Sequence, residues 1–71
     1  MTIGTRIKEC RRKANLSQVE LAERVGVSQT AISQWESCEH EPSSRYIMPL
    51  AEAVGVSAEY LLKGHHQGST T

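Results

Sequence analysis

Apolar residues near the start of the chain recur at helical spacing. Ile3, Ile7, Cys10 and Ala14 follow one another at intervals of four, three and four residues, which places them on one face of a helix. Charged residues fall elsewhere around that helix: Arg6, Lys8, Glu9, Arg12 and Lys13. The pattern predicts an amphipathic helix over residues 3–14 that packs through its apolar face.

The next two helices are predicted by their start and stop signals. Ser17 and Glu20 have the spacing of a capping box, in which each side chain accepts from the other residue's backbone N–H. Gly26 is the expected left-handed end of that helix. Ser28 then caps a helix running from about Gln29 to Ser37. The few residues between the two helices predict a steep crossing, as in a helix-turn-helix.

The second half of the chain predicts two further helices. Ser43 or Ser44 opens the fourth, which ends at Gly55, and Ser57 caps a short fifth helix that ends at Gly64. Pro49 conflicts with a continuous fourth helix, because it lacks an N–H and its ring clashes with the preceding turn. We therefore expect the fourth helix to start late, near Tyr46, in preference to a kink at Pro49.

These elements define the predicted fold class. No segment alternates apolar and polar residues as a strand would, so we predict an all-α, compact domain of five helices containing a helix-turn-helix. Residues 1–64 form this domain, and residues 65–71 form a polar tail or the start of an interdomain linker. No apolar run is long enough for a membrane span or a signal peptide, so we expect a cytoplasmic protein.

A repeated sequence helps to decide which helix contacts a ligand. Residues 21–28 and 50–57 are identical at seven of eight positions, and both end at a serine cap. The residues after Ser57 are mostly apolar, with Glu59 in the first turn, which predicts a helix packed against protein. The helix after Ser28 has instead an outer face without charge, made of Gln29, Thr30, Ser33, Gln34 and Ser37.

That outer face has the chemistry of base recognition. An ordinary solvated helix face is typically rich in Lys, Glu or Arg, and plain surface is the alternative interpretation of this one. Glutamine can both donate to and accept from adenine, a threonine methyl can contact thymine, and serine can pair with several base edges. Together with the tight turn, the face predicts a helix that reads bases in the major groove.

The charge distribution supports a nucleic-acid partner although the net charge is zero. Residues 1–15 carry five Lys or Arg residues against Glu9 alone, a net charge of +4. Residues 16–41 carry five glutamates against Arg24 alone, a net charge of −4. A dipolar molecule of this kind can offer a basic rim to phosphates.

Catalytic and metal chemistry find little support. The chain has no Asp, no nucleophile beside a base in a recognisable motif and no glycine-rich phosphate loop, so we expect no enzyme and no cofactor. Cys38, Glu39 and His40 could join His65 and His66 in a zinc site, but their spacing fits no regular finger. Cys10 and Cys38 are expected to be reduced thiols.

Taken in series, these motifs resemble the phage repressor and Cro type of helix-turn-helix protein, with a lambda-repressor-like fold. The resemblance covers residues 3–64 and rests on residues 16–22, 25–28, 32–36, 41–42, 50–51, 54–57 and 60–64. It implies a homodimer that represses transcription from a palindromic operator in double-stranded DNA. The acidic segment from Cys38 to Glu41 and Pro49 depart from the family pattern.

The resemblance also implies residue roles. The base-reading positions are Gln29, Thr30, Ser33 and Gln34. The positions near the DNA backbone are Gln18, which also supports Gln29, together with Ser28, Arg11, Ser43, Ser44 and Arg45. Arg11 is further expected to pair with Glu36, tying the first helix to the third. The dimer surface is expected on the fifth helix and its flanks, at Val56, Tyr60 and Leu61.

Two other functions compete with operator binding. An antitoxin of this fold would have a toxin as its main partner, although no added toxin-binding segment is evident unless the tail is one. A controller of a restriction-modification operon is a closer variant. Co-purification of a second chain or the genomic neighbours would distinguish these roles.

Overall fold

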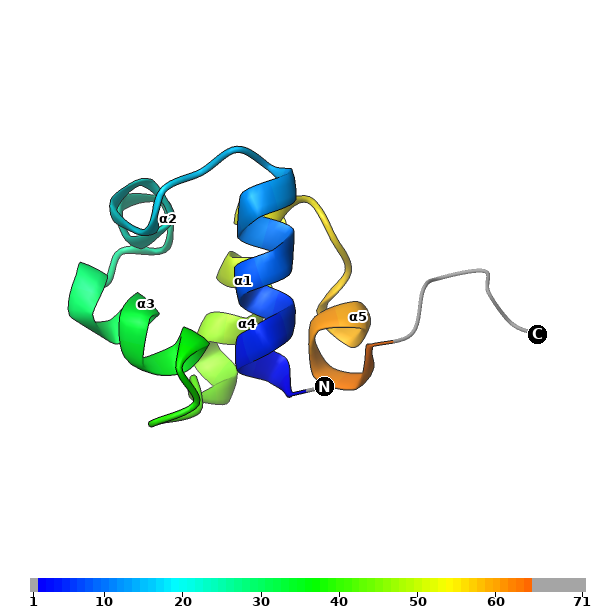
Figure 1. Ribbon diagram of the computed structural model, residues 1–71. Helices are drawn as coiled ribbons and strands as arrows, with labels where there is room; N and C mark the ends of the chain where they lie inside the picture. Colours follow the sequence, from blue (N-terminus) through cyan, green and yellow to red (C-terminus); the bar gives the residue numbers. More distant parts are fainter. Residues whose placement is uncertain (1, 65–71) are drawn as a thin grey trace.

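In the computed structural model, the described residues 2–64 form five α-helices (Figure 1). Their bounds are α1, Ile3–Lys13; α2, Gln18–Val25; α3, Gln29–Glu36; α4, Ser44–Val54; and α5, Ala58–Lys63. The predicted all-helical class and helix-turn-helix are confirmed. The predicted tail at 65–71 lies outside the described residues. Among those residues, no helix is long and apolar enough to cross a membrane.

The predicted N-caps of α2 and α3 are confirmed by their hydrogen bonds. Ser17 Oγ accepts from the Glu20 N–H at 3.0 Å, and Glu20 Oε1 accepts from the Ser17 N–H at 2.8 Å. Ser28 Oγ accepts from the Ala31 N–H at 3.1 Å. Gly26 has φ of 87°, in the left-handed region that ends α2.

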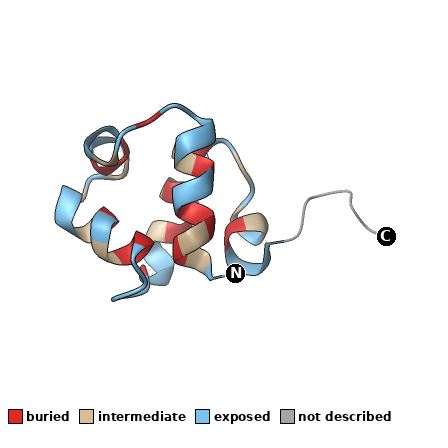
Figure 2. Cartoon of the chain, in the orientation of Figure 1, coloured by how far each residue is buried: buried red, intermediate tan, exposed pale blue. Residues whose placement is uncertain are grey.

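Each helix contributes one fully buried large side chain to a shared core: Ile7, Leu21, Ile32, Leu50 and Leu61. Figure 2 shows that the buried residues lie on the sides of the helices that face one another. Burial of such a side chain contributes about 1.5–3 kcal/mol. The core therefore joins all five helices, and no single helix is a detachable appendage.

Arg6 departs from the sequence expectation, because it is buried instead of lying on the outer side of α1. Its Nε donates to the Leu61 carbonyl and its Nη2 to the Leu62 carbonyl, both at 2.7 Å. These carbonyls belong to the last turn of α5, where C=O groups have no partner within the helix. The guanidinium thus caps α5 from α1. Ala14 was also expected on the buried face, but it is exposed and lies past the end of α1.

The expected late start of α4 is wrong. The helix begins at Ser44 and continues through Pro49. A proline inside a helix costs about 3 kcal/mol, whereas α4 buries four side chains along one face: Ile47, Leu50, Ala51 and Val54. At about 1.5–3 kcal/mol for each large one, this burial outweighs the cost of the proline. Arg45, whose carbonyl loses its helical donor at Pro49, is an exposed residue, so water can donate to it.

The sequence analysis also missed a close approach at Gly4. A Cβ at Gly4 would overlap the backbone carbonyl oxygen of Trp35 and would lie 3.1 Å from Cys38 Sγ. The absence of a side chain at Gly4 therefore lets the start of α1 pack directly on the end of α3.

We expect Gly4→Ala to lower the free energy of unfolding by about 1–3 kcal/mol, the usual range for an overpacked site. Alanine would by itself stabilise a helix by up to ~1 kcal/mol relative to glycine. A net loss of stability would therefore come from the overlap with Trp35. Urea denaturation measures the change. Lys8→Ala, at an exposed position of α1, is the control and should have little effect. An unchanged or raised stability of Gly4→Ala would contradict the close approach.

Candidate nucleic-acid interface

The candidate interface is built on α3, which a tight turn joins to α2. The N–H groups of Gly26 and Val27 both donate to the Ala22 carbonyl, at 2.8 and 3.0 Å. Ser28 then caps α3. Because only three residues separate the two helices, α2 lies across one end of α3, and α3 also packs against α1 (Figure 1).

The two sides of α3 differ as the sequence predicted. Ile32 and Trp35 are buried on the inner side. On the outer side, Gln29, Thr30 and Ser33 are exposed and Gln34 is half-buried. Trp35 anchors the helix further, because its ring lies 5.4 Å from the Tyr46 ring, centre to centre. The uncharged side chains therefore project from a helix whose orientation is set by its buried side.

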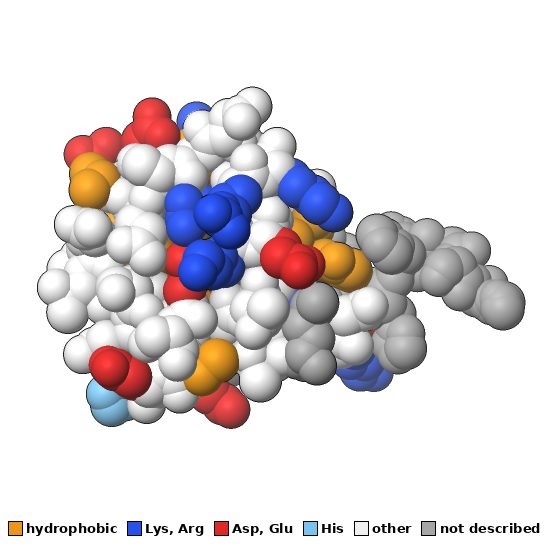
Figure 3. All heavy atoms as spheres, in the orientation of Figure 1, with side chains coloured by type: hydrophobic (Ala, Val, Ile, Leu, Met, Phe, Trp, Pro, Cys, Tyr) orange, Lys and Arg blue, Asp and Glu red, His pale blue; other side chains and the backbone are white. Residues whose placement is uncertain are grey.

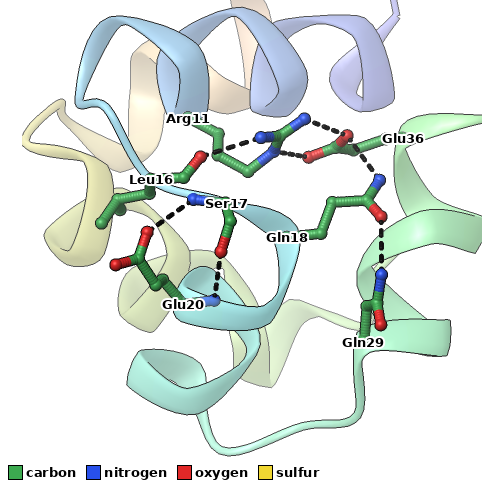
Figure 4. Close-up of polar contacts among 7 residues, drawn as sticks. All are labelled: Arg11, Leu16, Ser17, Gln18, Glu20, Gln29 and Glu36. Atoms are coloured by element: carbon green, nitrogen blue, oxygen red, sulfur yellow. Dashed lines mark hydrogen bonds and ion pairs between the residues drawn. The ribbon is translucent and has the colours of Figure 1, made fainter.

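A chain of polar contacts runs from α1 to the end of α3, then to α2 and back to the start of α3 (Figure 4). Arg11 Nε donates to Glu36 Oε2 at 2.6 Å, and its Nη2 donates to Glu36 Oε1 at 3.1 Å. Gln18 Nε2 donates to the same Oε1 at 3.1 Å. Gln29 Nε2 in turn donates to Gln18 Oε1 at 3.3 Å. The Arg11–Glu36 pair and the Gln18–Gln29 contact, both implied by the family resemblance, are thus present, and the Glu36–Gln18 link between them was not anticipated.

The ion pair lies largely out of solvent. The side chains of Arg11 and Glu36 are 12% and 3% exposed. The remaining guanidinium nitrogen of Arg11 donates to the Leu16 carbonyl at 2.8 Å. All three nitrogens of Arg11 therefore have partners within the protein, which leaves this residue little surface for the expected phosphate contact.

The start of α4 lies next to the end of α3, where the rings of Tyr46 and Trp35 are in contact. Ser43, Ser44 and Arg45 are all exposed there. Ser43 is the N-cap, but its side chain makes no capping hydrogen bond. The guanidinium of Arg45 lies 5.6 Å from the centre of the Tyr46 ring. The exposed N-terminus of α4, where Ser43 supplies no side-chain cap, suits an anion.

The charged surface is arranged unevenly around α3. Figure 3 shows Lys and Arg side chains gathered over α1, beside the uncharged surface over α3. The exposed basic residues of α1 are Lys8, Arg12 and Lys13. The exposed segment from Cys38 to Glu41, which follows the C-terminal end of α3, carries two glutamates and His40. The basic rim predicted from the sequence therefore borders only one side of the uncharged face.

The expected dimer residues are not equally accessible. Val56 and Tyr60 are half-buried, whereas Leu61 has no exposed surface and belongs to the core. Leu61 therefore cannot itself contact a second copy of the chain, and this expectation is corrected. Its neighbour Leu62 is 53% exposed. A helix of six residues has fewer than two turns, so its sequence pattern could not show which of the two leucines faces the core.

Both cysteines are free thiols. Cys10 is buried and Cys38 is exposed, and burial raises the pKa of the Cys10 thiol. Cys38 has a φ of 69° and its Sγ lies 3.1 Å from Thr2 Oγ1. Within residues 2–64, no three His, Cys, Asp or Glu residues are grouped as metal ligands. His65 and His66 of the weighed zinc site lie outside the described residues.

Comparisons with known proteins agree with this geometry. A family model described as helix-turn-helix matches residues 7–61. The repressor protein C2 of Salmonella phage P22 is 45% identical over 62 residues, which are 87% of this chain and 29% of that protein. The crystal structure of the P22 c2 repressor with a synthetic operator has a TM-score of 0.86 at 43% identity and covers 92% of this chain and 98% of that one.

A second DNA complex is also similar. The structure of SinR, a master regulator for biofilm formation, in complex with DNA has a TM-score of 0.79 at 33% identity and covers 84% of this chain and 97% of that chain. Against curated relatives the chain is short, since it spans 29% of the P22 repressor and 58% of the prophage-derived regulator YonR of Bacillus subtilis. By sequence and by fold, the chain belongs to the helix-turn-helix family and its resemblance to phage repressors is confirmed.

Proposed function

We propose that the chain is the DNA-binding part of a phage-repressor-type transcriptional regulator that binds a near-palindromic operator in double-stranded DNA. The observation that carries this proposal is the exposed, uncharged outer face of α3 beside the basic side chains of α1. The similarity to the P22 repressor, whose structure contains a synthetic operator, supports it. DNA binding also favours the bacterial cytoplasm as its place of action.

In this proposal α3 lies in the major groove and reads base edges. Gln29, Thr30, Ser33 and Gln34 are the base-reading residues, because their side chains can donate to and accept from bases or contact a thymine methyl. They stand on a helix that Ile32 and Trp35 hold against the core. A rigid helix of this kind presents its side chains at a defined depth in the groove.

Phosphate contacts then position the domain. Gln18 begins α2 and its side chain contacts Gln29, the residue after Ser28, while Ser43, Ser44 and Arg45 lie at the exposed start of α4. These two groups flank α3, so they would contact the backbone on both sides of the groove. Phosphate contacts carry no direct sequence information, but they set the register in which base contacts occur.

Dimerisation through the α5 side completes the proposal. Figure 1 shows α5 and α3 on opposite sides of α1. Contact between two copies through Val56, Tyr60 and the exposed Leu62 would therefore leave both α3 helices free. A symmetric dimer of this family places its recognition helices about 34 Å apart, one turn of DNA. Selection of bound sequences from a random duplex pool tests the proposal, which requires a two-fold symmetric motif with that spacing.

Substitutions at Gln34 and Arg45 should separate base reading from phosphate binding. Gln34→Ala should lose about 1–3 kcal/mol of discrimination at one base pair of the half-site. Arg45→Ala should instead weaken binding to all sequences alike. It should also reduce the steepness of log K against log salt by about 2, because each of the two subunits loses one phosphate contact, from a slope of about −5 if some six phosphates are neutralised per dimer. Fluorescence anisotropy titrations with operator and scrambled duplexes measure both effects. Full sequence preference in Gln34→Ala would contradict the assigned face.

Leu62→Glu should weaken the dimer, because it places a charge on the proposed apolar contact. Sedimentation equilibrium without DNA measures the change, and we expect the dimer dissociation constant to rise by about tenfold or more, equal to about 1.4 kcal/mol. Val19→Glu, which changes a similarly exposed apolar residue on α2, is the control and should leave the equilibrium unchanged. An unaltered dimer in Leu62→Glu would place the contact elsewhere.

A further inference from the structure

In the series of hydrogen bonds from Arg11 to Gln29, the Arg11–Glu36 end determines which groups donate and which accept. Arg11 has only hydrogen-bond donors, and the Glu36 carboxylate has only acceptors. Glu36 Oε1 lies 3.1 Å from the side-chain amide of Gln18. Only the NH₂ group of that amide can donate, so Gln18 must turn its nitrogen to Glu36 (Figure 4).

This direction passes to Gln29. With its nitrogen turned to Glu36, Gln18 directs Oε1 towards Gln29, whose amide lies 3.3 Å away. An amide oxygen only accepts, so Gln29 must present an N–H to Gln18. One N–H of Gln29 is therefore occupied within the protein, and its other N–H and its Oε1 remain on the exposed side chain.

We propose that Glu36 is a positioning residue that makes Gln29 select adenine over guanine at one base pair of the half-site. This assignment rests on the proposed function, in which α3 reads bases. Glu36 itself is buried, with a side chain 3% exposed, so it acts through Gln18 and Gln29 without contacting DNA.

The donors and acceptors left on Gln29 account for the selection. Adenine presents one donor and one acceptor in the major groove, which match one Oε1 and one N–H. Guanine presents two acceptors there. A glutamine with one N–H already occupied can satisfy only one of them, and its Oε1 would face the other. If the side chain at position 36 could both donate and accept, the amides of Gln18 and Gln29 would no longer be held in one orientation.

The test compares Glu36→Gln with Arg11→Gln. Glu36→Gln replaces the obligatory acceptor by an amide of the same shape. Arg11→Gln also removes the ion pair, but it keeps the Glu36 carboxylate and a donor beside it. Both variants should lose stability in urea denaturation. Only Glu36→Gln should lose the fixed orientation of the Gln18 and Gln29 amides. A comparison of the two variants therefore distinguishes an effect of amide orientation from an effect of lost stability.

The base pair that Gln29 reads is first identified as the position of the half-site at which Gln29→Ala no longer discriminates between bases. Affinities are then measured for two duplexes that differ only there, with adenine or guanine, at a temperature where all variants are folded. We expect the adenine-to-guanine affinity ratio to fall at least about fivefold in Glu36→Gln, within the range of one bidentate contact, and to persist in Arg11→Gln. Gln18→Ala, which leaves the ion pair intact, should lose the ratio in the same way and keeps the test decisive if Glu36→Gln does not fold.

The outcomes are distinguishable. Retention of the ratio in folded Glu36→Gln or in Gln18→Ala overturns the assignment, as does an equal loss in Arg11→Gln, which would indicate general structural support. A wild-type protein without base preference at any position overturns the proposed function itself and this assignment with it.

Discussion

The buried ion pair between Arg11 and Glu36 is the interaction on which the orientation of α3 relative to α1 depends. Removal of one partner from such a pair typically costs 3–5 kcal/mol, because the other charge is left without compensation. That is a large fraction of the stability of a domain of this size. The carboxylate is also the only part of the pair that contacts Gln18. The ion pair thus joins α1 to α3, and its carboxylate is linked through Gln18 to Gln29 on the outer face of α3.

Close packing at the other end of the α1–α3 contact completes this arrangement. Gly4 allows the backbone of α1 to approach the Trp35 carbonyl, while Arg11 holds the opposite end of α1 to Glu36. Both ends of α1 therefore hold the C-terminal end of α3, at Trp35 and Glu36. A chain of 71 residues buries a modest core, so such polar and backbone contacts carry much of the precision that an interface needs.

The repeated sequence at residues 21–28 and 50–57 shows how context separates two similar helix starts. Both serines cap their helices through the same hydrogen bond to the third residue, at 3.1 Å for Ser28 and 3.0 Å for Ser57. The helix after Ser28 exposes amides and hydroxyls, whereas the helix after Ser57 buries Leu61 and receives Arg6 at its end. The local motif is the same and both helices bury one side in the core, so the residues that follow the motif decide what the outer face of each helix carries.

The sequence by itself determined the five helices, their caps and the uncharged face of α3, because these depend on residues within one or two turns of each other. Only the tertiary structure decided the burial of Arg6, the passage of α4 through Pro49 and the link from Glu36 to Gln18. Arg6 and Leu61 are 55 positions apart, and Gln18 and Glu36 are 18 apart. Contacts at such separations arise only when helices pack, and their energies outweigh the local preferences that a periodic pattern records.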